Sequence, residues 1–142
     1  MSDTPETNTA LDLFAEFATD TQAEEAGVWV DLNDKASFLI ARANNPTYAR
    51  KFTKLYERNR QLLNTKGAAA EAKAEEITIS LLADAILLGW KGDFTWQGKP
   101  MPYSKENAKT MLAVKDFRRW VQEKADDFER FKLVQDKEEA GN

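Results

Sequence analysis

The sequence predicts a predominantly α-helical (α+β) protein with about four to five helices and a small N-terminal β-hairpin. Several long segments repeat apolar residues at helical spacing, whereas only two short segments near the start have strand-like composition. Of the 142 residues, 42% are apolar and 11% are aromatic, which is enough for one hydrophobic core. We therefore expect a single globular domain over residues 11–133, between a flexible acidic tail (residues 1–10) and a flexible C-terminal tail (residues 134–142).

The N-terminal third predicts a short helix followed by the hairpin. The segment LDLFAEFA (residues 11–18) has three apolar residues on one helical face, and TDTQAEEAG after it is typical of a loop. GVWVDL (residues 27–32) and ASFLIARA (residues 36–43) have the composition of strands, and the turn residues NDK separate them. A hairpin of this size needs helices packed against it to be stable.

The second predicted helix covers residues 46–63. Asn45 suits its N-cap, and Pro46 suits its first position. Tyr48, Phe52 and Tyr56 share one apolar stripe, which we expect to face the core. The opposite, outer face is basic and is formed by Arg50, Lys51, Lys54, Arg58 and Arg60.

Three further helices are expected in the rest of the chain. Residues 67–88 begin as an alanine-rich helix and end apolar on all sides, as a central helix does, with Gly89 expected as a left-handed C-cap. Ser104 is a favoured cap for the next helix, and Asp116 for the last one, which ends near Leu133. The last helix carries an aromatic stripe that is typical of a core, although such a stripe also suits a partner helix.

The connector between residues 89 and 104 contains aromatic residues and glycines in a pattern that first suggests a ligand site. Its glycines match no phosphate-binding motif, so we interpret it as a hinge-like connection. We expect Trp90 and Tyr103 to hold its two ends against the core, and residues 92–98 to form a short hairpin tip that exposes Phe94 and Trp96. The candidate partner-binding residues are Trp90, Phe94, Trp96, Tyr103, Trp120, Phe128 and Phe131.

The composition disfavours catalysis. The chain has no cysteine and no histidine, which excludes disulfides, ordinary zinc sites and Ser-His-Asp or Cys-His catalysis. Asp84 is the one carboxylate that burial would perturb, and Arg42 is its expected partner; an enzyme using Asp84 or Asp93 is only a remote option. We expect no enzyme activity, no cofactor and no metal, and neither a signal peptide nor a membrane span.

The charges are distributed unevenly along the chain. Residues 1–36 carry a net charge of −8 and residues 37–66 one of +6. Such asymmetry can mark a nucleic-acid surface, which would use the basic helix of residues 46–63. The acidic overall pI disfavours that interpretation. The favoured alternative is that the acidic arm pairs with the basic helix of its own chain or of a neighbour.

From Gly27 onward, the order and spacing of several short segments resemble a known protein family. These segments are FLIARANNPTYARKF, LLADAILLGWKG, GKPMPYSKENAKTML and DFRRWVQEKADDFERF. Together they resemble the tail assembly chaperones of long-tailed (siphovirus-type) bacteriophages over about three quarters of the chain. No single segment is specific, and the acidic N-terminal arm lies outside the resemblance.

The resemblance implies a non-enzymatic, mostly helical and self-associating protein of the host bacterial cytoplasm that is absent from the mature virion. Such chaperones coat the aggregation-prone tape measure protein until tail tube subunits polymerise around it. In many phages a ribosomal frameshift yields a longer form that recruits the tail tube protein. These partners, and a homo-oligomer, are expectations for this chain.

Overall fold

The computed structural model describes residues 10–134. These residues form seven α-helices, one 3₁₀ helix and five strands in two sheets. The helices are α2 (Leu13–Phe17), α3 (Thr21–Ala26), α4 (Pro46–Arg58), α5 (Arg60–Leu63), α6 (Ala68–Ala85), α7 (Lys105–Leu112), α8 (Lys115–Ala125) and the 3₁₀ helix η1 (Phe128–Phe131). The strands are β1 (Val28–Asn33), β2 (Ala36–Ile40), β3 (Leu87–Gly92), β4 (Thr95–Trp96) and β5 (Lys99–Pro100).

The predicted fold class is wrong in its details, because it counted four to five helices and a single hairpin. The expected hairpin exists as β1–β2, but it is part of a three-stranded antiparallel sheet in the order β1-β2-β3. The additional helices α3 and α5 have six and four residues, too few for a helical period to be recognised. Helix α3 lies in the segment expected to be a loop, and the Asp20 carboxylate caps it by accepting from the Gln22 and Ala23 N–H groups.

The largest departure lies at the end of α6, where an apolar segment leaves the helix and becomes strand β3. Helix α6 ends at Ala85, and the chain then pairs with β2 in the register Phe38↔Trp90 and Leu39↔Gly89. Gly89 is therefore a strand residue and not a helix cap, so that prediction is wrong. A short apolar run is compatible with either a buried helix or a buried strand. Here the segment is a strand because β2 is available to pair with it.

The predicted last helix is divided in two. Helix α8 ends at Ala125. The N-cap of η1 is Asp127, whose carboxylate accepts from the Glu129 N–H. Asp116 lies in the first turn of α8 instead of at its N-cap, which is Val114, so the predicted cap is wrong. The predicted caps Asn45 and Ser104 are confirmed, because each accepts from the backbone N–H three residues later.

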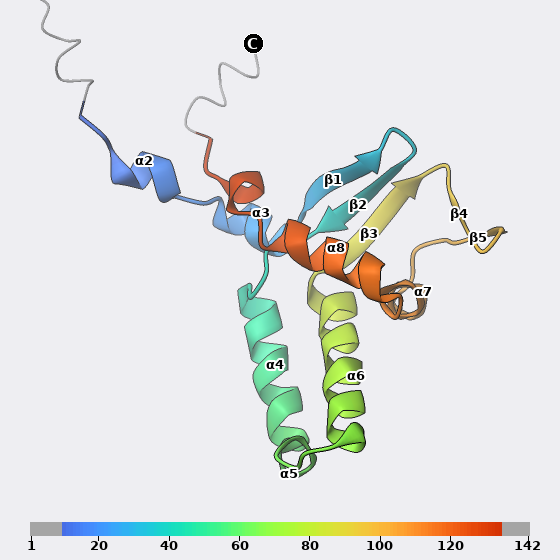
Figure 1. Ribbon diagram of the computed structural model, residues 1–142. Coiled ribbons are helices and arrows are strands. Elements are labelled where there is room, and N and C mark those ends of the chain that lie inside the picture. The colour runs from blue at the N-terminus through green and yellow to red at the C-terminus, as the bar shows by residue number, and fades with distance from the viewer. Residues whose placement is uncertain (1–9, 135–142) are drawn as a thin grey trace, which may run out of the picture.

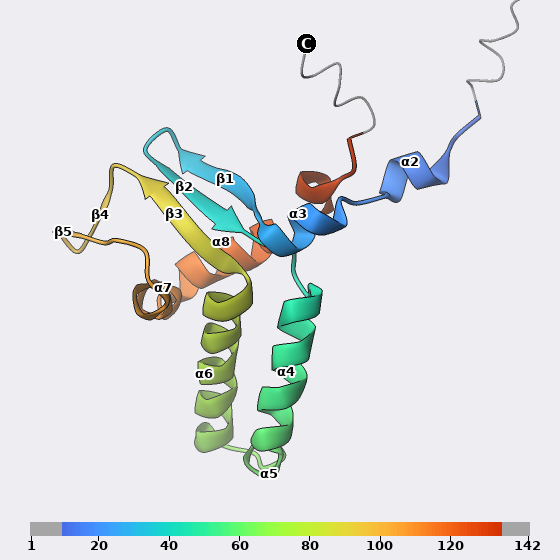
Figure 2. The ribbon, with the colours of Figure 1, turned by 180° about the vertical axis from the view of Figure 1, so that it is seen from behind.

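Figures 1 and 2 show how these elements are arranged. Helix α8 crosses one face of the β1-β2-β3 sheet, and the opposite face carries no helix. Helices α4 and α6 form an antiparallel pair that projects from the sheet, with α5 at its far end, while α2 extends away from the body on the other side. The predicted tails lie almost wholly outside the described residues, and the domain boundaries stay predictions.

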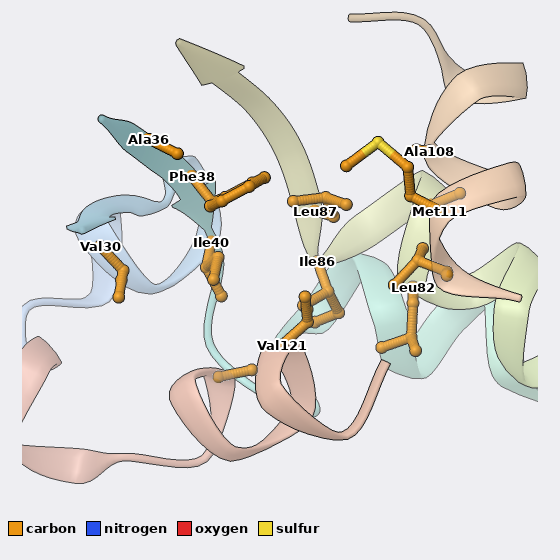
Figure 3. Close-up of a cluster of buried hydrophobic side chains, with 13 residues drawn as sticks. Val30, Ala36, Phe38, Ile40, Leu82, Ile86, Leu87, Ala108, Met111 and Val121 are labelled. Carbon is orange, nitrogen blue, oxygen red and sulfur yellow. The ribbon is translucent and has the colours of Figure 1, made fainter. Parts of the chain in front are cut away.

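The core lies between the sheet, the C-terminal half of α6, α7 and α8. Figure 3 shows side chains from all of these elements converging, and the largest fully buried ones include Ile40, Leu87 and Met111. Phe38, from the central strand, is the aromatic centre of the core: its ring contacts the rings of Trp90, Phe94, Phe117 and Trp120 at centroid distances of 5.4 to 6.3 Å.

Candidate interaction surface

Helix α4 carries three aromatic side chains in a row, which we call the aromatic ladder: Tyr48, Phe52 and Tyr56. Their rings are stacked at centroid distances of 6.4 Å and 5.8 Å, as the i,i+4 spacing of a helix allows. We expected this stripe to face the core, but Phe52 is 43% exposed and Tyr56 is 40% exposed, so that expectation is wrong for both. An amphipathic pattern identifies an apolar stripe but not how much of it the neighbouring helix covers.

A groove of about 500 Å³ lies beside the inner end of the ladder. Tyr48 from α4, Leu82 from α6, Ile86 and the surface of α8 line this α4–α8 groove, with Arg119, Gln122 and Glu123 at its α8 side. Burial raises the pKa of the Tyr48 hydroxyl above its ordinary value. The groove and the ladder share Tyr48, so the row of aromatic rings leads into the groove, whose α8 side is polar.

The predicted basic surface surrounds α4. Arg50, Lys54, Arg58 and Arg60 are exposed, whereas Lys51 is half-buried. Arg60 lies one helical turn after Tyr56 and forms an ion pair of 3.5 Å with Glu57. Apart from that glutamate, α4 and α5 carry no acidic residue. The structure therefore places exposed aromatic rings and a dense positive charge on the same helix.

The predicted hairpin tip exists as β4–β5, with Gln97 and Gly98 in left-handed conformations at its turn. Its aromatic residues are not the exposed contacts we expected. Phe94 packs on Phe38, and Trp96 packs on Phe117 at a centroid distance of 6.4 Å. Both side chains are partly buried against the core, so their expected exposure is wrong.

The two ends of that connector are held as predicted. The Trp90 indole N–H donates to the Met101 carbonyl oxygen over 2.7 Å, and its ring meets Tyr103 edge-on at 5.0 Å. Tyr103 remains 39% exposed. It is the most exposed of the seven residues predicted to bind a partner, and their role in binding stays a prediction.

The C-terminal aromatics lie in two places. Trp120 packs against the core cluster, as the favoured assignment of this stripe to the core predicts. Phe131 is buried, whereas Phe128 contacts Phe17 from α2 at 5.9 Å. The stripe is thus not one continuous surface, because the chain bends between α8 and η1.

Asp84 has a different partner from the one predicted. Asp84 pairs with Lys105 at 3.4 Å, and not with Arg42, which instead pairs with Glu24 at 3.4 Å. The predicted pair of Asp84 with Arg42 is therefore wrong. Lys105 on α7 pairs with Asp84, and Glu24 on α3 pairs with Arg42. The sequence does not specify where α7 and α3 lie. Among residues 10–134 there is no group of three or more residues suited to hold a metal ion, and no helix has the length and apolar character to cross a membrane.

Sequence reasoning missed the exposure of α2. Leu11, Leu13, Phe14 and Phe17 are each 61–68% exposed, the highest values of any large apolar side chains in the described residues. Their helical spacing was recognised, but spacing alone cannot show that a helix lacks a surface to pack on.

Comparison with known protein families gives a match. A family model described as YdaY prophage protein matches residues 43–142, from just before α4 onward. No curated protein and no solved structure matches this chain. The matched region includes the aromatic ladder, the α4–α8 groove and the basic residues of α4.

Proposed function

Since the chain belongs to the YdaY prophage protein family and is therefore phage-derived, we propose that it is a tail assembly chaperone. In this role it binds the tape measure protein without catalysis and keeps that protein soluble until the tail tube polymerises around it. It acts in the host bacterial cytoplasm, is absent from the mature virion, and meets the tail tube protein through a frameshifted longer form. The resemblance of the segments after Gly27 to tail assembly chaperones supports this proposal.

The observation that carries the proposal is the aromatic ladder, which leads into the α4–α8 groove. Exposed apolar side chains on a helix pair are the usual receptor for an amphipathic client helix. Phe52 and Tyr56 supply rigid rings that lose little conformational entropy on binding, and the groove beside Tyr48 has room for an inserted side chain. Repeated weak contacts of this kind along a long client give avidity and still permit release.

The surrounding charge suits the same role. Arg50, Lys54, Arg58 and Arg60 keep the exposed aromatic surface soluble and attract a client helix whose polar face is acidic. Positive charge alone does not specify a client, so the apolar contacts determine affinity and the charges determine orientation.

Co-expression tests the proposal. The tape measure protein of the same phage should be recovered in the soluble fraction with the wild-type chain, and should return to the pellet with the variant Phe52→Ser/Tyr56→Ser. The matched control is Trp29→Ser/Leu32→Ser, which removes two exposed apolar side chains from β1 and should leave the client soluble. A client that stays insoluble with the wild-type chain contradicts the proposal.

A second function, binding of single-stranded nucleic acid, is favoured by one observation. The exposed rings of Phe52 and Tyr56 lie on the same helix as Arg50, Lys54 and Arg58, as in stacking platforms for bases. The affinity of the chain for a labelled oligonucleotide should fall steeply as the salt concentration rises. The variant Phe52→Ser/Tyr56→Ser should bind the oligonucleotide more weakly. Absence of binding at low salt removes this alternative.

A further inference from the structure

We infer that the chain self-associates by exchanging its N-terminal arm: α2 of one copy docks on the aromatic ladder and the α4–α8 groove of a second copy. A two-fold symmetric pair makes this contact twice, because each copy offers one arm and one receiving surface. The inference rests on burial and charge within this chain and does not depend on the client proposed above.

The arm has an apolar face without a surface of its own. Phe14 and Phe17 lie three residues apart on one side of α2, and Leu13, Phe14 and Phe17 are each more than 60% exposed. Within the described residues the Phe17 ring contacts the ring of Phe128 at 5.9 Å, and Phe17 nevertheless remains 66% exposed. An isolated helix of five residues is not stable in water, so a surface that covers its apolar face stabilises the helix as well.

The arm and the receiving surface have opposite charges. Residues 1–18 contain four acidic side chains and no basic one, whereas residues 46–63 contain five basic side chains and one acidic one. On α2 itself the Glu16 carboxylate is exposed, and the exposed cations Arg50, Lys54 and Arg58 lie on the same helix as the ladder. Glu123 and Asp126 line the groove, so the ladder helix supplies the positive charge. Such complementarity orients the arm and speeds its encounter with the second copy.

The attachment of the arm directs it away from its own α4. Ala18 and Asp20 are fixed to the C-terminal segment: the Leu133 N–H donates to the Ala18 carbonyl, and the Asp20 N–H donates to the Phe131 carbonyl, both over 2.8 Å. From this fixed point α2 extends away from the helix pair in both views (Figures 1 and 2). A second copy can receive the arm without any change at this attachment.

The buried area suits a specific dimer. A phenylalanine buries about 150–250 Å² when it is covered, so Phe14 and Phe17 from two arms, together with the leucines and the surfaces they cover, exceed the roughly 1,000 Å² of a specific interface. The open face of the sheet, with Trp29 and Leu32 exposed, is the competing surface for a second copy. This sheet face carries both an acidic residue, Asp31, and a basic one, Lys91, so it has no net charge opposite to that of the arm. In addition, the Lys91 ammonium group lies 4.2 Å from the centre of the Trp29 ring and covers it.

Light scattering after size exclusion, across a range of protein concentrations, tests the inference with three full-length double variants. Leu13→Ser/Phe14→Ser alters the arm, Phe52→Ser/Tyr56→Ser alters the ladder, and Trp29→Ser/Leu32→Ser is the control. All six residues are exposed, so the fold should persist, and circular dichroism verifies this. The wild-type and control chains should form dimers, and the arm and ladder variants should each raise the dissociation constant by about tenfold or more.

Mixing the arm variant with the ladder variant distinguishes exchange between copies from docking within one copy. The mixture should regain part of the association, because one of the two contacts in a mixed pair joins the intact arm of the ladder variant to the intact ladder of the arm variant. A wild-type chain that is monomeric at all concentrations overturns the inference, and so does loss of association in the β1 control instead of the arm variant. Since the assay contains no client, its outcome is independent of the proposed function.

Discussion

At the scale of single residues, Asn45 joins three parts of the fold. Its side chain is only 3% exposed; its carbonyl oxygen caps α4 by accepting from the Tyr48 N–H, and its amide group donates to the carbonyls of Arg42 and Ala85. The residue thus links the end of the hairpin, the start of α4 and the end of α6. A cap was predictable from the sequence, but the contact with Ala85, forty residues away, was not.

We predict that Asn45→Ala lowers the free energy of unfolding by about 2–3 kcal/mol, because it removes the cap and leaves the buried Ala85 carbonyl without this donor. Asn59→Ala is the control, since Asn59 donates only to Leu55 at the end of α4, and it should cost about 1 kcal/mol or less. Urea unfolding of both variants measures the difference, and equal losses would refute the linking role of Asn45.

Tyr48 provides a prediction about pH. Burial raises the pKa of its hydroxyl in the folded protein, so the folded state holds this proton more tightly than the unfolded state. The resulting stabilisation is fully present below about pH 10 and is lost as the pH rises through the folded-state pKa. Between about pH 9 and 11 the free energy of unfolding should therefore fall less steeply in Tyr48→Phe than in the wild type.

The control for this measurement is Tyr56→Phe, whose ring belongs to the same ladder but is exposed. Contributions that the three proteins share cancel in the comparison. Identical pH dependence in Tyr48→Phe and the wild type would show that the hydroxyl of Tyr48 is not buried in solution.

At the scale of elements, the junction of β3 with the turn between β1 and β2 requires a glycine. Gly92 has φ of +131°, and a Cβ there would overlap the Lys35 carbonyl oxygen and lie 2.9 Å from the Ala36 Cα. Gly67 has a similar φ of +129° but open space around it. We predict that Gly67→Ala costs about 1–2 kcal/mol from backbone strain alone, and that Gly92→Ala costs clearly more in thermal or urea unfolding. Equal costs would mean that β3 does not approach Lys35 this closely.

The β4–β5 hairpin is held to the core by its aromatic residues, which changes the expected effect of one substitution. A solvent-exposed Trp96 would tolerate replacement, whereas the Trp96 ring packs on Phe117 beside the core. We predict that Trp96→Ala lowers the free energy of unfolding by about 2–3 kcal/mol. Trp29→Ala, at a tryptophan that is 46% exposed, should cost less than about 1 kcal/mol. A Trp96→Ala protein as stable as the wild type would indicate that the Trp96 side chain is exposed to solvent.

At the scale of the whole molecule, two regions keep exposed apolar surface. The sheet, α6, α7 and α8 enclose the core, while α2 and the outer side of α4 retain exposed aromatic rings on opposite parts of the molecule. The arm and the ladder helix both expose apolar side chains, and their sequence segments carry opposite charges. Both the proposed client binding and the proposed arm exchange follow from this distribution.

The sequence by itself determined the local features of this protein. The caps at Asn45 and Ser104, the β1–β2 hairpin and the basic character of α4 all follow from residues close together in the chain, where hydrogen bonding and side-chain spacing are local. The lack of cysteine and histidine is likewise a property of the sequence alone. The candidate basic residues could therefore be identified in advance.

Only the tertiary structure decided which apolar segments are covered. Leu87 to Gly92 became a strand because β2 offered a partner, and Phe94 and Trp96 were covered because the Phe38 cluster lies beside them. Phe52 remained 43% exposed because no element among residues 10–134 covers it. Burial depends on neighbours that are distant in the chain, whereas periodicity reports only which side chains share a face. The uncovered face of α2 is the clearest case: its pattern is that of a packed helix, and only the fold shows that its apolar side chains stay exposed among residues 10–134.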